Sequence, residues 1–177
     1  MTDAAPITAY IGLGSNLDNP HTQITRAFDA LAVLPDSKLV ARSPLYRSRA
    51  VGPPQPDYIN AVAALHTRLP ALALLDALQG IEQAHRRVRK QHWGPRTLDL
   101  DLLLYGEHTL DLPRLSVPHP YLSERNFVLY PLADIAPTLV LPDGRSLAAL
   151  LEHCDRDGLV PVNETELTTG AVSGTHL

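Results

Sequence analysis

A short acidic strand constrains the fold of this chain most. Residues 99–105 alternate Asp99 and Asp101 with leucines and then continue in leucines, which predicts a strand with one face buried in the core. Side chains at i and i+2 share one face of a strand, so the two carboxylates point the same way and the intervening leucines point the other way. Two such charges repel by about 1 kcal/mol at ~4 Å in water, and by about 4 kcal/mol at an effective dielectric near 20. We therefore expect a cation to offset them.

A basic segment lies directly before this strand. It contains Arg86, Arg87, Arg89, Lys90 and Arg96, five of the 15 lysines and arginines, together with Trp93. Arginine forks match phosphate oxygens, and Mg²⁺ takes oxygen ligands from carboxylates and substrate phosphates. Taken alone, an Asp-x-Asp pair lies more often on a solvated strand face, and a basic run is more often a solvated helix end. Their tandem arrangement favours a site for a metal-bound polyphosphate.

Composition narrows the function classes. The formal net charge of −4 argues against a general electrostatic hold on nucleic acid, and no apolar run reaches the ~18 residues of a membrane span. The N-terminus lacks the basic and apolar regions of a signal peptide. Because Cys154 is the only cysteine, no internal disulfide can form. We predict a cytoplasmic protein without membrane or nucleic-acid partners.

The order of elements predicts an α+β fold with a ferredoxin-like β-α-β-β-α-β core. Strands are expected at residues 7–13, 38–48 (irregular at Pro44), 58–67 and 99–105. Helices are expected after Asn19-Pro20 and from near Pro70, with short elements after the fourth strand and a short helix at 147–151. We assign Gly12 and Gly14 to a turn after the first strand. Residues 1–154 are expected to form a single domain, and residues 155–177 a loose C-terminal tail.

Several motifs in sequence order resemble one enzyme family. They are Gly12-Leu13-Gly14-Ser15-Asn16-Leu17, Gln55-Pro56-Asp57-Tyr58-Ile59-Asn60, Ile81-Glu82 with Arg87-Val88-Arg89-Lys90, the run from His92 to Leu103, and Val117-Pro118-His119. The run His92-Trp93-Gly94-Pro95-Arg96-Thr97-Leu98-Asp99-Leu100-Asp101 is the most specific of these. Together they resemble 6-hydroxymethyl-7,8-dihydropterin pyrophosphokinase (2-amino-4-hydroxy-6-hydroxymethyldihydropteridine diphosphokinase).

The resemblance implies an activity and a set of site residues. It implies transfer of pyrophosphate from ATP to the hydroxymethyl group of the pterin, with release of AMP, in folate biosynthesis. It implies two Mg²⁺ ions at Asp99 and Asp101, and catalytic roles for Arg87 and Arg96 beside them. ATP contacts are implied for Gln79, Glu82, Arg89, Arg96, Leu102, Arg114, Ser116 and His119. Pterin contacts are implied for Val51, Tyr58, Asn60, Trp93, Arg125 and Phe127.

The residues alone support a smaller set, namely Asp99, Asp101 and Arg96. A flat pterin suits aromatic neighbours such as Tyr58 and Phe127, although core packing is the simpler role for a phenylalanine in an apolar stretch. The segment at residues 48–52 departs from the family, which often has a threonine and a proline ahead of the glycine. Two other functions remain open: a base-stacking nucleic-acid module, and a Mg²⁺-dependent phosphohydrolase that uses the same aspartates. We expect small-molecule substrates and a monomer.

Overall fold

The structure is a computed structural model, and it describes residues 5–16, 19–49, 56–88 and 98–162. Its first elements are β1 (Ile7–Ser15), α1 (Pro20–Ala32), β2 (Ser37–Arg42), β3 (Tyr46–Ser48), β4 (Tyr58–Thr67), α2 (Ala71–Val88) and β5 (Asp99–Tyr105). The elements β6 (Leu110–Leu112), β7 (Leu115–Val117), η1 (Leu122–Glu124), α3 (Asn126–Ile135), α4 (Leu147–Glu152) and β8 (Leu159–Pro161) follow. The predicted β-α-β-β-α-β order is confirmed. No helix in the described part is both long and apolar enough to cross a membrane.

The second predicted strand is divided into β2 and β3 around Pro44. Proline has no N–H to donate, so the ladder is interrupted there. Ser43 bridges the gap: its N–H donates to the Val62 carbonyl at 2.8 Å, and its hydroxyl oxygen accepts from the Val62 N–H at 2.9 Å. Both short strands therefore remain paired with β4.

The main sheet is antiparallel and has the order β5-β1-β4-β3-β8, with β2 also paired to β4. Strand β1 lies between β5 and β4. In its register Gly14 lies opposite both Asn60 on β4 and Asp99 on β5, and Gly12 lies opposite both Val62 and Asp101. This corrects the assignment of the two glycines to a turn, because both lie inside β1.

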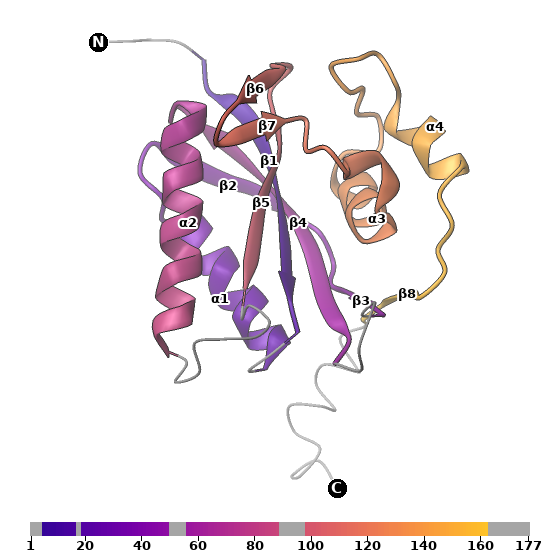
Figure 1. The fold of residues 1–177 in the computed structure, drawn as a ribbon, viewed down its shortest axis with the longest axis horizontal. Helices are drawn as coiled ribbons and strands as arrows, with labels where there is room; N and C mark the ends of the chain where they lie inside the picture. Colours follow the sequence, from indigo (N-terminus) through magenta and orange to yellow (C-terminus); the bar gives the residue numbers. More distant parts are fainter. Residues whose placement is uncertain (1–4, 17–18, 50–55, 89–97, 163–177) are drawn as a thin grey trace, which may run out of the picture.

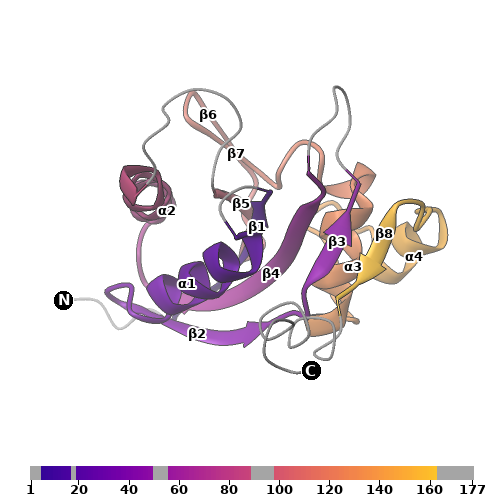
Figure 2. The same cartoon turned by 90° about the horizontal axis from the view of Figure 1, so that it is seen from below.

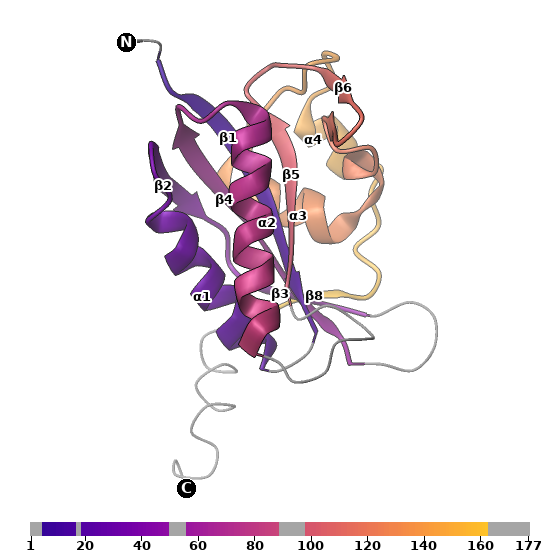
Figure 3. The same cartoon turned by 60° about the vertical axis from the view of Figure 1, so that its left-hand side comes forward.

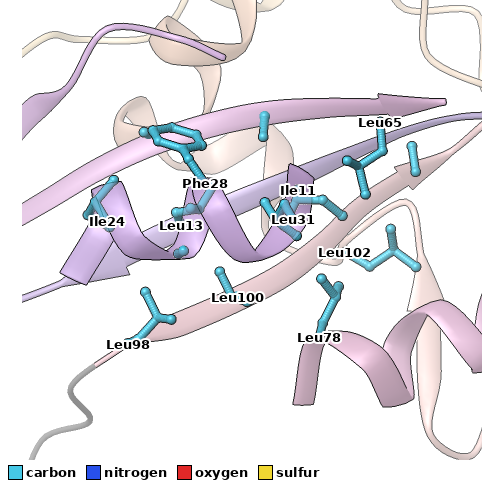
Figure 4. Packing of buried hydrophobic residues seen from close by; sticks show 14 of the residues in the cluster. Ile11, Leu13, Ile24, Phe28, Leu31, Leu65, Leu78, Leu98, Leu100 and Leu102 are labelled. Carbon is cyan, nitrogen blue, oxygen red and sulfur yellow. The ribbon is translucent and has the colours of Figure 1, made fainter. Parts of the chain in front are cut away.

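Helices cover the two faces of this sheet unequally. Helices α1 and α2 lie on one face, and α3 and α4 lie on the other (Figures 1 and 3). The larger core lies under α1 and α2 and contains the alternating leucines of the acidic segment, Leu98, Leu100 and Leu102, which are 2%, 5% and 3% exposed. Figure 4 shows these leucines packed with side chains of both helices. The second core joins Leu103 and Val62 to α3 and α4. The predicted alternation of the acidic strand is confirmed.

The segment after α4 is ordered further than expected. Strand β8 pairs antiparallel with β3 and extends the sheet, and Val162 is buried. The expectation of a loose tail from residue 155 therefore does not hold for residues 155–162. Only three residues of β8 pair with β3, which is too short to give a clear alternating pattern. The rest of the expected tail lies outside the described residues.

Candidate active site

A pocket of about 440 Å³ opens on the α3 side of the sheet, where β1, β4 and β5 run side by side. Its lining includes six of the residues predicted from the sequence: Asp99, Asp101, Tyr58, Asn60, Arg125 and Phe127. Gly12, Leu13, Gly14, Ser48, Arg49, Ala61 and Val128 complete it. The carboxylates and the four pterin contacts that lie in the described part of the chain thus share one cavity, although they come from three separate segments.

The two glycines of β1 form the floor of this pocket. A Cβ atom on Gly14 would lie 3.1 Å from Nδ2 of Asn60, and one on Gly12 would lie 3.4 Å from a Leu103 methyl group. A methyl on either residue would fill space that the pocket now keeps open. Sequence reasoning missed this role. The signal was present, because the glycines have the same i, i+2 spacing as the aspartates and therefore share one face of their strand.

Ser48 sets the orientation of the Asn60 amide. The Ser48 hydroxyl donates to Oδ1 of Asn60 at 2.6 Å, and both side chains are buried. Since Oδ1 accepts this bond, Nδ2 is the atom that lies over Gly14. The amide thus presents a fixed N–H donor at the pocket floor. Ser48 was not among the predicted site residues.

The two aspartates lie half-buried on the pocket side of β5, as their spacing predicted. The pKa of the Tyr58 hydroxyl is raised, chiefly by burial and then by the negative charge of Asp99. The pKa of His119 is lowered by burial, while Asp101 acts to raise it and Arg125 to lower it. The charge of Asp99 therefore acts on Tyr58, and the charge of Asp101 acts on His119.

Two carboxylates fit a cation that takes its other ligands from elsewhere. Among the residues that the structure describes, no group of three or more His, Cys, Asp or Glu side chains could hold a metal ion. Mg²⁺ does not need such a cage, because it commonly binds one or two carboxylates, substrate phosphates and water. The donor set at Asp99 and Asp101 is of this type.

His119 is held as a neutral ring with a defined tautomer. Its backbone N–H donates to the Leu103 carbonyl at 2.9 Å, and its Nδ1 accepts from the Tyr121 N–H at 3.2 Å. Because Nδ1 is an acceptor, the ring proton lies on Nε2 in the neutral form. The lowered pKa favours this neutral form near pH 7. His119 therefore offers an N–H donor beside Asp101.

Arg125 stands between two aromatic rings at the pocket edge. Its guanidinium carbon lies 5.0 Å from the ring centroid of Tyr121 and 5.6 Å from that of Phe127. Such cation–π contacts hold the planar guanidinium in place at the pocket edge. Phe127 and Arg125, both predicted to contact the pterin, line the same pocket.

Among the described residues predicted to contact ATP, Gln79 and Glu82 lie on α2, and Arg114 and Ser116 lie in the β6–β7 hairpin. Arg114 donates to Asp76 at 2.5 Å and to Gln79 at 3.2 Å on the surface of α2. Ser116 is exposed on β7. The side chain of Leu102 is buried in the larger core, so a contact from this residue would have to come from its backbone.

Glu82 has a structural partner within the fold. It is 7% exposed, and its carboxylate accepts the N–H of Leu100 at 2.7 Å. This bond ties the last part of α2 to β5 between the two aspartates. The structure thus places Glu82 behind the acidic strand, on the face opposite the pocket.

Other predicted residues lie outside the described part of the chain. These are Val51, Arg89, Trp93 and Arg96, and the side chain of Arg87 belongs with them. The basic segment that precedes the acidic strand therefore keeps its predicted roles as predictions.

Comparisons with known proteins agree on one family. The model of the 7,8-dihydro-6-hydroxymethylpterin-pyrophosphokinase family matches residues 10–137. A Pseudomonas aeruginosa protein named 2-amino-4-hydroxy-6-hydroxymethyldihydropteridine pyrophosphokinase is 59% identical over 151 residues, covering 85% of this chain and 93% of its own length. A protein of the same name from Haemophilus influenzae is 46% identical over 158 residues, covering 89% and 99%.

Solved structures support the fold. A crystal structure of HPPK-DHPS in complex with substrates superimposes with a TM-score of 0.66 at 12% identity, and wild-type Plasmodium falciparum HPPK-DHPS with pteroate gives 0.67 at 14%. The alignments cover 85% and 86% of this chain but 43% of each of those longer chains. With the sequence relatives, they confirm the predicted ferredoxin-like α+β architecture. This chain belongs to the 7,8-dihydro-6-hydroxymethylpterin-pyrophosphokinase family.

Proposed function

We propose that this protein transfers the β,γ-pyrophosphoryl group of ATP to the hydroxymethyl oxygen of 6-hydroxymethyl-7,8-dihydropterin and releases AMP. In this reaction the hydroxymethyl oxygen bonds to the β-phosphorus, and the bond from that phosphorus to the oxygen bridging to the α-phosphorus breaks. AMP leaves with the bridging oxygen, and the hydroxyl proton is released. The row formed by Asp99, Gly14 and Asn60 carries the proposal, because it joins a carboxylate to a bare floor and an oriented amide.

The flat floor and its neighbours suit a pterin. With no side chain on Gly12 or Gly14, a planar heterocycle fits beside β1, and the Asn60 amide meets the polar edge of the ring. Tyr58 and Phe127 supply aromatic surface in the same pocket. A volume near 440 Å³ lies in the range of small-molecule sites.

The charged residues of the site are proposed to bind the metal and the triphosphate. We propose that Asp99 and Asp101 hold two Mg²⁺ ions, as the resemblance to the family implies. When bound, Mg²⁺ supplies charge neutralisation at the phosphate oxygens. The neutral His119 ring offers its Nε2–H donor beside Asp101. These groups position charge, which is the main requirement of phosphoryl transfer.

The remaining family residues are proposed by their place in the motifs. Arg87, Arg89 and Arg96 are assigned to the triphosphate, while Val51 and Trp93 are assigned to the pterin. For Arg96→Ala we expect kcat to fall while the KM for the pterin changes little, because a transition-state contact affects turnover more than ground-state binding. A defect confined to pterin KM would contradict this role.

One product assay separates the proposal from its rivals. The protein is incubated with ATP, Mg²⁺ and the reduced pterin alcohol, and the nucleotides are resolved by chromatography. We expect AMP in equal amount to pterin consumed, and none without the pterin. ADP or free phosphate as the main product would instead indicate a phosphohydrolase, and salt-sensitive RNA binding without AMP would indicate a nucleic-acid module.

We further propose that the enzyme is a cytoplasmic monomer with a single pyrophosphokinase domain, expected at residues 1–154 and extended by β8 to residue 162. Sedimentation of the purified chain tests the oligomeric state. A stable dimer at micromolar concentration would overturn that part of the proposal.

A further inference from the structure

The pocket has two walls that belong to separate elements. Ser48 and Arg49 lie at the end of β3, and Arg125, Phe127 and Val128 lie at the start of α3. The pocket can bind a planar ligand only if these walls keep their spacing. Both walls also contact the segment formed by residues 154–162, which we call the C-terminal clamp. Figure 2 shows β8 of this segment beside β3.

The clamp binds the α3 wall through side-chain amide and hydroxyl donors. Nδ2 of Asn126 donates to the carbonyls of Asp155 and Asp157, at 2.9 and 3.1 Å. The hydroxyl of Tyr130, one turn further along α3, donates to the Cys154 carbonyl at 2.7 Å. Asn126 lies between the two pocket residues Arg125 and Phe127 in sequence, so its bonds fix the part of the helix that forms the wall.

The clamp binds the β3 wall through the backbone. Strand β8 pairs with β3 along its whole length, and the N–H of Arg49 donates to the Gly158 carbonyl at 3.1 Å. Gly158 has φ +78°, and a Cβ there would lie 3.5 Å from Cβ of Arg49. Arg49 thus packs directly over Gly158.

A direct bond between the walls reinforces the clamp. The hydroxyl of Tyr46 on β3 donates to Asp134 on α3. Arg156 of the clamp stacks on the Tyr130 ring, 4.8 Å from its centroid, and its charge also acts on Tyr46. The clamp, β3 and α3 therefore share one hydrogen-bonded and charged network behind the pocket.

We infer that residues 154–162 position the two walls of the pterin pocket, with Asn126 as the positioning residue that transmits this constraint to the α3 wall. The inference rests on the proposed function, because it assigns the pocket to the pterin. It predicts that loosening the clamp weakens pterin binding selectively. ATP binding is affected less, since Gln79 and Arg114 lie on the other side of β5.

The test uses two variants of the full chain. Asn126→Asp keeps the shape of the side chain but sets a carboxylate against two carbonyl oxygens, while a negative charge at this helix start is otherwise tolerated. Gly158→Ala adds a methyl group against Arg49 at a positive φ. Thr25→Val is the matched control, because it removes a hydroxyl-to-carbonyl bond of 2.9 Å on α1, across the sheet.

For both variants we expect the KM for the pterin to rise about five- to tenfold, while the KM for ATP stays within about twofold. Pterin titration in the presence of Mg²⁺ and a non-cleavable ATP analogue should show the same loss of affinity. The control should match the wild type. Equal increases in both KM values, unchanged pterin affinity, or failure of both variants to fold would overturn the inference. Absence of AMP formation by the wild type would instead overturn the proposed function, and the pterin titration would still test the clamp.

Discussion

Adding one methyl group at Gly14 tests whether the bare floor of the pocket is needed for function. In Gly14→Ala the new Cβ would lie 3.1 Å from Nδ2 of Asn60 and 3.9 Å from the ring of Tyr58. Ordinary contacts begin near 3.4 Å, so the amide must move by a few tenths of an ångström. That shift strains the 2.6 Å bond from Ser48 to Asn60 and tilts the donor that faces the pterin.

The expected changes in stability and in binding differ in size. Weakening the bond from Ser48 to Asn60 costs about 1 kcal/mol, whereas alanine in a strand interior gains roughly 0.5–1 kcal/mol over glycine. The free energy of unfolding should therefore change by less than about 1 kcal/mol. Pterin affinity loses a positioned hydrogen bond and part of the floor, which together correspond to about a tenfold or larger loss.

The assay pairs thermal unfolding with pterin titration and steady-state kinetics. Gly80→Ala is the control, because a Cβ there meets nothing within 4 Å on α2. That variant should gain up to about 1 kcal/mol in stability and keep wild-type pterin affinity. If Gly14→Ala binds the pterin as the wild type does, the floor does not set the site and the reasoning is wrong.

Three further outcomes follow from the site and its support. Asp99→Asn or Asp101→Asn should reduce turnover by about 10³-fold or more, with an unchanged or higher Tm, because relief of carboxylate repulsion accompanies loss of the metal site; wild-type-like turnover would refute the metal assignment. Glu82→Ala should lower stability by about 1–3 kcal/mol by stranding the buried N–H of Leu100, and calorimetry should show a lower Tm. Burial and a neighbouring carboxylate raise the pKa of Tyr46 to about 12, so its contribution to stability is full below pH 10 and is lost as pH rises toward 12; Tyr46→Phe should flatten that part of a denaturation series.

Local patterns predicted the fold well because its determinants are local. Alternation in residues 99–105 gave the strand, its buried face and the common direction of the two aspartates, all of which the structure has. Proline positions gave both helix starts, since Pro20 begins α1 and the Pro70 carbonyl accepts the first bond of α2. Pro44 predicted an irregular strand but not its division into β2 and β3, because the pairing at the break depends on the hydrogen bonds between Ser43 and Val62 of β4.

The site was predicted less completely, for a physical reason. Gly14 and Asn60 acquire their roles only through the register of β1 with its two neighbours, and register depends on how the whole sheet assembles. A glycine in a short motif indicates a turn as readily as a pocket floor within a strand, so the motif alone could not separate the two. Only the matching i, i+2 periods of the glycines and aspartates carried that information.

The order of the C-terminal clamp was also not predicted, because it depends on contacts with distant residues. Residues 155–162 have no apolar period because their order comes from partners: the Asn126 amide, the edge of β3 and the ring of Tyr130. A segment that is held mainly through its backbone carbonyls need not show a hydrophobic pattern in its own sequence. The residue that reveals it is the donor, Asn126, which lies between two predicted substrate contacts and does not itself line the pocket. A polar residue between two predicted substrate contacts is therefore a candidate positioning residue for the site.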